Sequence, residues 1–344
     1  MKRKSEYLLI GHFTKDILPD ENYKLGGTVY YSGITAKKLG SEVKILTSFA
    51  SDIAKEISKN KLLKKMEIIN IPSRHSTTFK NVYPVRNSQN LTLRKKYFKS
   101  PLRNCISNRV YFVEKRKQFL YSRARKILPK FLPQNWENPS ILHLAPLAGE
   151  VSGKTAKEFK NSLIGATLQG WLRKKNKDNS VSFNLGKNYR YYLPLFNVAI
   201  LSEHDVNCDL KLIKEFAKYA QTLVVTKGKK GCVIFQKNKV KIIKPKKIFS
   251  FGDLTGTGDV FAAAFLIKFK ETKNPSLAGV FANETACFHI EKGIGYSGYQ
   301  KKWSNLPKVG KIWTKIGDCL PKILTFFSKT ASFNSSKFFT SASI

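Results

Sequence analysis

The sequence predicts an α/β fold, a doubly wound and mostly parallel sheet with helices on both faces. Short apolar runs rich in valine, isoleucine and leucine recur along the chain, and such runs are typical of strands that are buried on both faces. Amphipathic stretches of helical length separate them, which is the rhythm of β–α units. The hydrophobic share, 42% of 344 residues, is enough to bury a large core.

The predicted elements alternate from the N-terminus onward. Buried strands are expected at residues 7–10, 43–47, 141–144, 198–201 and 223–226. Helices are expected at residues 29–39, 155–163 and 210–219, and an Ala-rich apolar helix follows Asp259. Because active sites of such sheets lie at the carboxyl ends of the strands, functional residues are expected just after the apolar runs.

Two segments depart from this rhythm. Residues 84–115 are basic and poor in acids, and they lie between strand-like segments at 77–83 and 118–122. Hairpin loops are usually short, so we expect an insertion at the tip of a hairpin. From about residue 301 the chain is basic and aromatic, and residues 332–344 are rich in Ser and Phe, which predicts a low-complexity tail at 301–344.

The formal net charge of +39 is the most unusual bulk property. A strongly basic surface attracts polyanions, which raises nucleic acid as a partner. The Lys and Arg residues are spread along the chain, however, and no RNA-recognition signature or zinc finger accompanies them, so nucleic-acid binding is not expected. No apolar run reaches the length of a membrane span. Five scattered cysteines without a C-x-x-C pattern suit a reducing compartment, and we expect a cytoplasmic protein.

The sharpest chemical signal is the run from Asp253 to Asp259, which reads Asp-Leu-Thr-Gly-Thr-Gly-Asp and precedes the Ala-rich helix. Gly256 and Gly258 let the backbone around Thr257 turn its N–H groups inward, and the helix N-terminus adds partial positive charge. Together they predict a cradle for the charge of a transferring phosphoryl group. Asp259, kept ionised by the same dipole, would take the proton of an attacking hydroxyl. A plain helix N-cap is the alternative interpretation of Gly-Asp here.

This run resembles the second signature of the ribokinase-like (PfkB) carbohydrate kinases, commonly Asp-Thr-Thr-Gly-Ala-Gly-Asp before an apolar helix. The sequence departs from it at Leu254 and Thr257 and keeps both glycines and both acids. The resemblance covers roughly residues 6–300. It implies a kinase domain over 1–300, with small β-lid pieces at about 12–30 and 74–125, and a homodimer contact through the lid in some members.

The acceptor side of the resemblance rests on the N-terminal region. The run from Gly11 to Asp16 is similar to the family's first strand and its sugar-binding Asp. Gly26 and Gly27 match the di-glycine that lets the substrate approach the backbone. The family often has Asn where Tyr31 stands here, and some inositol-kinase-like members carry an aromatic residue there. Turn and cap chemistry are the alternative interpretations of these positions.

The donor side implies ATP and Mg2+. Ser202 and Asp205 lie where the family has Asn-x-x-Glu, which organises phosphate and magnesium, so Asp205 is the candidate metal ligand. Three residues resemble the strand-end turn that lines the nucleotide site: Thr226, Gly228 and Gly231. Asn283 resembles the family's adenine-side Asn. These matches imply phosphorylation of an alcohol, while a surface amide remains the alternative for Asn283.

The acceptor follows less directly from the sequence. An aromatic face at Tyr31 packs on the C–H surface of a ring, which favours a cyclic polyol such as an inositol, or a nucleoside, over fructose phosphates. The charge of +39 favours a phosphorylated acceptor instead.

Two other functions stay open at this point. The run from Ala148 to Thr155 fits a relaxed Walker A pattern with Lys154, which would make the chain a P-loop NTPase. Against it, the first position is not Gly, and no later strand ends in the Asp of a Walker B motif. The basic insertion, the basic tail and the weakened Asn-x-x-Glu motif also fit a non-catalytic nucleic-acid-binding protein on a degenerate kinase scaffold.

Overall fold

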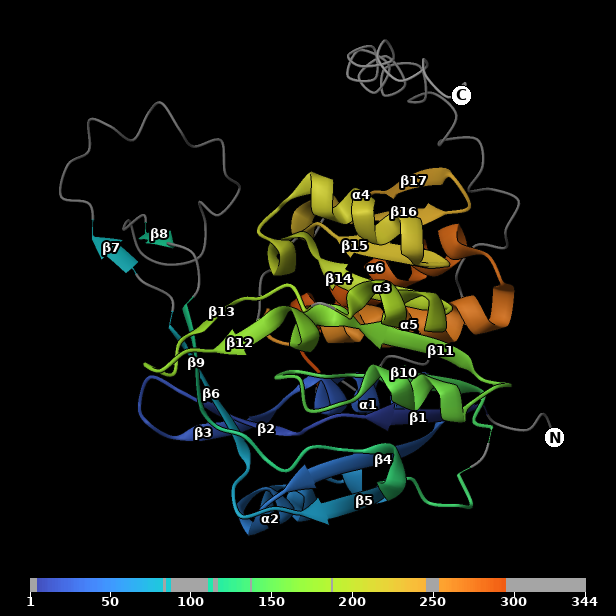
Figure 1. Ribbon diagram of the computed structural model, residues 1–344. Coiled ribbons are helices and arrows are strands. Elements are labelled where there is room, and N and C mark those ends of the chain that lie inside the picture. The colour runs from blue at the N-terminus through green and yellow to red at the C-terminus, as the bar shows by residue number, and fades with distance from the viewer. Residues whose placement is uncertain are drawn as a thin grey trace, which may run out of the picture. The chain divides into compact units, whose positions relative to one another are not determined.

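The computed structural model describes residues 5–82, 85–87, 111–113, 117–136, 138–186, 188–245 and 254–294. The chain divides into two units, Met1–Ser297 and Gly298–Ile344, and every described residue lies in the first. The tail predicted for 301–344 therefore lies outside the described residues. Within these limits the first unit contains a nine-stranded sheet covered by helices and a smaller four-stranded sheet (Figure 1).

The large sheet has the order β17-β16-β15-β14-β11-β10-β1-β4-β5. Its parallel strands are β1 (Glu6–Ile10), β4 (Glu42–Phe49), β5 (Glu67–Pro72), β10 (Ile141–Leu144), β11 (Leu163–Thr167), β14 (Val198–Ser202) and β15 (Thr222–Thr226). The antiparallel strands β16 (Cys232–Gln236) and β17 (Lys239–Ile243) complete one edge. The predicted doubly wound, mostly parallel sheet is confirmed.

The first strand lies between β10 and β4, and the chain builds the sheet outward from it in two directions. This makes β1 the point where the strand order reverses. Crevices form there, beyond the carboxyl ends of the strands, because the connections on the two sides leave toward opposite faces. The backbone after β1 is held close to its neighbour, since Ala145 N donates to Ile10 O over 2.8 Å.

Helices cover both faces of the large sheet (Figure 1). On one face α5 (Thr257–Thr272) packs against both α1 (Thr28–Lys38) and α6 (Pro275–Lys292). On the other face lie α4 (Leu210–Tyr219) and the short α3 (Tyr189–Tyr192), while α2 (Ser51–Lys59) follows β4. Because side chains of a strand alternate between faces, β1 feeds Leu8 and Ile10 into the core cluster under α4, and Tyr7 and Leu9 to the opposite side.

The smaller sheet has the order β3-β2-β6-β9 and consists of β2 (Thr14–Ile17), β3 (Tyr23–Gly26), β6 (Thr77–Val82) and β9 (Lys117–Ser122). A hairpin of β12 (Arg173–Lys175) and β13 (Val181–Phe183) joins its edge, where Leu120 N donates to Asn179 O over 2.8 Å. We refer to the four strands as the lid sheet. Both strands predicted to flank the insertion are present as β6 and β9.

Inside the predicted insertion at 84–115, two short segments are described. They are β7 (Val85–Asn87) and β8 (Tyr111–Val113), which pair with each other in antiparallel register. The remainder of that insertion lies outside the described residues. Its description as an insertion at the tip of a hairpin stays a prediction.

The helix expected at 155–163 is wrong. The structure has a 3-10 helix, Gly153–Glu158, and then the buried strand β11, which pairs with β10 and β14. The run Leu-Ile-Gly-Ala-Thr of β11 is apolar and only five residues long, which suits a strand buried on both faces. Gly165 lies where the Leu266 side chain of α5 packs onto the sheet, at a point where a Cβ would stand only 2.4 Å from it. No helix among the described residues is long and apolar enough to cross a membrane.

Candidate active site

Asp259 lies in the first turn of α5, at the carboxyl-end side of the large sheet, and is partly buried. The pKa of its carboxyl is raised to about 7, chiefly by burial, with a smaller contribution from the negative charges of Asp16 and Asp205. A hydrogen bond with Thr28 and the Arg173 guanidinium lower it less. The expectation that Asp259 is kept ionised therefore does not hold around neutral pH, because removal from water raises the pKa of its carboxyl.

Two helix N-termini meet at this carboxyl group. The first, α1, begins at Thr28, directly after Gly26 and Gly27, and Thr28 hydrogen-bonds to the Asp259 side chain. One turn later Ser32 Oγ donates to the Asp259 backbone oxygen over 2.9 Å. Helix α1 therefore fixes both the backbone and the carboxyl group of the candidate base. The first-turn N–H groups of both helices have no partner within their helices, so they favour negative charge here.

The two glycines before Asp259 differ in their surroundings. Gly256 is the N-cap of α5 with φ 76°, and a Cβ there would lie 2.2 Å from the Tyr31 ring. At Gly258 a Cβ would meet no atom within 4 Å, so the outer side of this glycine is open. His289 Nε2 lies 2.9 Å from Thr255 O and its ring meets Tyr31 edge to face at 6.0 Å. The loop is thus supported from inside by two aromatic rings and open on its other side.

Tyr31 is predicted from the sequence to face the acceptor. In the structure it is buried, 5% exposed, and its ring lies against Gly256 and His289. These contacts give the ring a role in supporting the glycine loop. The described contacts of Tyr31 therefore do not support the preference for a cyclic acceptor.

On the acceptor side, β2 and β3 bring Asp16 against the di-glycine. Thr14 Oγ1 donates to Asp16 Oδ1 over 2.8 Å, and a Cβ at Gly26 would lie 2.3 Å from Asp16 Oδ2. At Gly27 φ is 95°, and a Cβ would lie 2.6 Å from His12 O. Only glycine fits this turn without moving the backbone, because an L side chain is strained at such a φ. The predicted trio of Asp16, Gly26 and Gly27 does lie together.

Asp205 caps the 3-10 helix Glu203–Val206. Ser202 N donates to Asp205 Oδ2 over 2.9 Å, and Gln169 Nε2 donates to Oδ1 over 3.3 Å. The Arg173 Nη2 lies 3.7 Å from the same Oδ1. Among the described residues, no group of three or more His, Cys, Asp or Glu side chains could hold a metal. Asp205 would therefore act as a single carboxylate ligand for Mg2+ that is also bound by the phosphates of the donor, and proteins usually bind Mg2+ in this way.

On the nucleotide side, the four predicted residues separate into two pairs. Thr226 ends β15, and Gly228, with φ 52°, has open space where a Cβ would be. Gly231 and Asn283 instead hold the end of β17, because Asn283 Nδ2 donates to Ile243 O over 3.1 Å and a Cβ at Gly231 would lie 2.0 Å from that oxygen. Asn283 is 6% exposed, so its described role is to position this strand end. Asp253 lies outside the described residues.

The Walker A interpretation of 148–155 does not agree with the structure. The Glu150 carboxylate accepts hydrogen bonds from Leu147 N and Ala148 N at 2.7–3.0 Å. A P-loop needs such N–H groups for phosphate, and here they bind the protein's own carboxylate. Gly153 packs under Tyr192, and the chain continues as a 3-10 helix instead of an α-helix.

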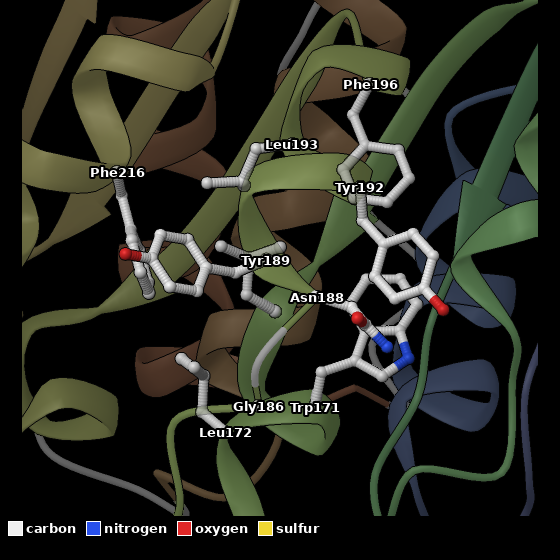
Figure 2. A pocket seen from close by; sticks show the side chains of 10 residues that line it. Trp171, Leu172, Gly186, Asn188, Tyr189, Tyr192, Leu193, Phe196 and Phe216 are labelled. Carbon is white, nitrogen blue, oxygen red and sulfur yellow. The ribbon is translucent and has the colours of Figure 1, made fainter.

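An apolar cavity of about 130 Å³ lies away from these acids, between α3, α4 and the 3-10 helix Leu168–Leu172 (Figure 2). Trp171 stacks on Phe196 with ring centroids 5.5 Å apart and donates through Nε1 to Val151 O. Its lining has no carboxylate that could accept a proton. This aromatic cluster anchors the chain just before Arg173 and is no candidate for the chemistry.

Sequence reasoning missed three basic side chains near the acids. Lys24 pairs with Asp16 across β2 and β3, and its Nζ lies 3.5 Å from Thr255 Oγ1 in the glycine loop. Arg173 approaches Asp205, and His289 supports Thr255. A hairpin assigned to residues 14–26, with its turn at 18–22, would have placed Lys24 opposite Asp16 on the same face. No local pattern predicts the positions of Arg173 and His289, which depend on tertiary packing.

Comparisons with known proteins show sequence similarity over part of the chain. Residues 171–301 match the family model described as pfkB family carbohydrate kinase. A nucleoside kinase of Methanocaldococcus jannaschii is 28% identical over 214 residues, which are 58% of this chain and 61% of that protein. The chain thus spans about three fifths of the length of this curated relative.

Solved structures of ribokinase-family kinases share the fold. A pyrophosphate-dependent kinase in the ribokinase family, complexed with a pyrophosphate analog and myo-inositol, superimposes with a TM-score of 0.65 at 19% identity, over 86% of this chain and 99% of that one. The structure of the Methanocaldococcus jannaschii nucleoside kinase gives 0.53 at 19% identity, over 85% and 94%. The predicted ribokinase-like fold is confirmed.

Proposed function

We propose that the chain transfers a phosphoryl group to a hydroxyl of a small sugar, polyol or nucleoside, a proposal supported by the match of residues 171–301 to the model of the pfkB family of carbohydrate kinases. The observation that carries the proposal is Asp259. It lies where two helix N-termini meet, beside an open glycine loop, with a pKa raised to about 7. A carboxyl group that titrates near neutral pH suits a general base.

The proposed step is a direct transfer. The acceptor hydroxyl oxygen attacks the terminal phosphorus of the donor, and its proton passes to the Asp259 carboxylate. The bond to the leaving oxygen of the donor breaks, and the donor departs one phosphoryl group shorter. The backbone N–H groups of Gly256 and Gly258 face the charge that develops on the transferring group, while Thr257 N donates to Leu254 O within the loop. Fixed dipoles of this kind supply much of the rate enhancement.

The other residues hold the two substrates. Asp16 and Gly27 bind the acceptor, an arrangement supported by the close approach of β2 to the di-glycine turn. Thr226 and Gly228 line the donor site, with Gly231 and Asn283 behind them. The lid sheet covers the acceptor, and a homodimer through it stays a prediction.

The donor is proposed to be Mg-ATP. Asp205 would contact the magnesium, which would neutralise phosphate charge when it is bound. The carboxylate already accepts hydrogen bonds from Ser202 N and Gln169, so it offers one further contact rather than a cage. Pyrophosphate is the alternative donor, since one structural relative is pyrophosphate-dependent.

The test is a transfer assay with two donors. The full chain is incubated with ATP or with pyrophosphate and magnesium, against a panel of sugars, inositols, nucleosides and their phosphates, and phosphorylated product is detected by mass. We expect product with ATP and at least one acceptor. Product with pyrophosphate alone would overturn the choice of donor. An absence of product with both donors, in a folded protein that binds neither, would overturn the kinase assignment.

A further inference from the structure

A pocket of about 330 Å³ opens between the lid sheet and the loop after β10. Its floor is apolar and consists of Phe79 from β6, Leu120 from β9 and Leu147 from the loop, which pack together as one cluster. Its volume lies within the range of small-molecule sites, about 300–1,000 Å³. Nothing in the proposed function so far uses this space.

The pocket adjoins the proposed acceptor site. Leu147 Cδ1 lies 3.3 Å from the point where a Cβ at Gly27 would stand. Arg173, which lines the pocket, also approaches Asp205, with 3.7 Å between Nη2 and Oδ1, and acts electrostatically on Asp259. An acceptor whose hydroxyl faces Asp259 therefore has the pocket at its other end.

The rim of the pocket is strongly basic. Arg123, Arg173, Lys174 and Lys175 all line it, and no Asp or Glu is among its described lining residues. Arg123 Nη1 donates to Ala148 O over 3.0 Å, and Lys175 Nζ donates to Tyr121 O over 3.1 Å. Carbonyl oxygens carry no formal charge, so these contacts orient the two cations without neutralising them.

The acids nearby do not cancel this charge. The Glu150 carboxylate turns away to the backbone N–H groups of Leu147 and Ala148. Of the four basic side chains that line the pocket, only Arg173 approaches Asp205 among the described contacts. The Lys174 side chain is exposed, and Arg123 lies on the segment that leaves the lid sheet. Arg123, Lys174 and Lys175 therefore line the pocket without a carboxylate partner among the described residues.

We propose that this pocket binds an anionic group of the acceptor, so that the acceptor is a sugar or polyol that already carries a phosphate monoester. Arginine and lysine form short, charge-assisted hydrogen bonds with phosphate oxygens, and the Arg123 guanidinium adds planar, paired donors. The apolar floor contacts the carbon skeleton between the two ends. The inference rests on the proposed function and specifies its acceptor, and it reverses the preference for a neutral ring that Tyr31 suggested.

The inference is tested with paired acceptors. Binding of fructose 6-phosphate against fructose, and of myo-inositol 1-phosphate against myo-inositol, is measured by calorimetry on the full chain without a donor. Gluconate represents a carboxylate. Because charge-assisted contacts are each strong, we expect the phosphorylated member of at least one pair to bind at least about tenfold more tightly, and a hundredfold effect is within reach. Gluconate is expected to bind more weakly than this phosphate ester.

Lys174→Gln is the variant that locates the effect, and Lys177→Gln is its matched control. Both lysines are exposed and lie on the same β12–β13 hairpin, but Lys177 does not line the pocket. Lys174→Gln is expected to weaken binding of the phosphate ester about tenfold and to leave binding of the neutral partner and of ATP unchanged. Lys177→Gln is expected to change none of them. Arg123→Gln should repeat the effect of Lys174→Gln.

The outcomes separate the two proposals. Neutral and phosphorylated partners that bind equally, or a Lys174→Gln effect on ATP instead of the acceptor, would overturn the pocket assignment while leaving the kinase proposal intact. Tighter binding of gluconate than of either phosphate ester would overturn the phosphate assignment. Selective binding of a phosphate ester supports the inference even where no donor yields product, a result that would count against the kinase proposal alone.

Discussion

At the scale of single residues, the proposed chemistry depends most on the carboxyl group of Asp259. Burial raises its pKa to about 7, so the base loses its activity as the pH falls through neutrality. We expect kcat/KM to fall about tenfold per pH unit below about pH 7 and to level off above it, because kcat/KM reports ionisations of the free enzyme. A profile that stays flat from about pH 5 to about pH 8 would contradict a base with this pKa.

The hydroxyl group of Thr28 leads to a second prediction at the scale of single residues. It concerns the midpoint of the pH profile, which a purely structural role of Thr28 would leave unchanged. Its hydrogen bond stabilises the ionised form of Asp259 and lowers the pKa of that carboxyl. Thr28→Val keeps the shape of the side chain and removes the hydroxyl, so the midpoint of the pH profile is expected to shift upward. The measurement is kcat/KM against pH for both proteins. An unchanged midpoint with a uniformly lower rate would mean that Thr28 acts only on local structure.

Individual residues could be predicted from the sequence where a local pattern defines them. The glycines, Asp259 and Asp16 stand in short motifs, so their proximity was foreseeable. The pKa of Asp259 was not, because it depends on burial and on charges from β2 and from the helix after β14. Tyr31 was misplaced for a similar reason: its position on α1 was right, but only packing shows that its ring faces Gly256.

At the scale of elements, the glycine loop before α5 separates structural from chemical roles. Gly256→Ala would force a side chain into the Tyr31 ring at φ 76°, and we expect it to lower stability by about 2 kcal/mol or more. In Gly258→Ala the added methyl group would meet open space, so the melting temperature of the variant is expected to stay close to that of wild type. Its turnover is expected to fall, because the methyl group would occupy the side of the loop that we propose faces the phosphate. Thermal unfolding and turnover are measured on both variants.

The result for Gly258→Ala determines whether the predicted contrast between the two glycines holds. If Gly258→Ala turned over at the wild-type rate with both substrates, the open side of the loop would not face the transferring group. If it unfolded as readily as Gly256→Ala, the contrast between the two glycines would be wrong.

Most elements could be read from the sequence because burial on both faces leaves continuous apolar strands. The strands at β1, β4, β10, β14 and β15 and the helices α1 and α4 were predicted to within a few residues. The segment Gly153–Thr167 was not, since a five-residue apolar run fits a strand or part of a helix equally well. The run from Ala148 to Thr155 suggested a P-loop, which the contacts of Glu150 rule out.

At the scale of the whole molecule, the predicted insertion at 84–115 gives the clearest test of what the domain requires. We expect deletion of residues 85–114, with a short turn in their place, to leave phosphoryl transfer unchanged. Lengthening a surface loop costs only about 0.6 kcal/mol per doubling, so a fold of this type tolerates such insertions. Transfer assays and thermal unfolding of the deletion variant provide the measurement. Loss of all transfer in a protein that still folds would place the segment in the active site.

The charge of +39 was visible in the sequence, but its meaning was not. Composition cannot say which cations lie together, and the basic rim beside the lid sheet combines side chains from the segment after β9 and from the β12–β13 hairpin. Nucleic-acid binding on a degenerate scaffold stays an alternative prediction for the remaining charge, and steeply salt-dependent duplex binding would support it.

The central claim is that Asp259 is the base for phosphoryl transfer, and Asp259→Asn tests it most directly. Turnover and donor affinity are measured at about pH 8, with Asp20→Asn as the control because Asp20 is exposed at the lid turn. The account predicts that Asp259→Asn lowers kcat by about 10²–10⁴-fold while the donor Kd stays within about twofold of wild type, and that Asp20→Asn changes neither. Turnover above about a tenth of the wild-type rate in a folded Asp259→Asn protein would contradict the claim.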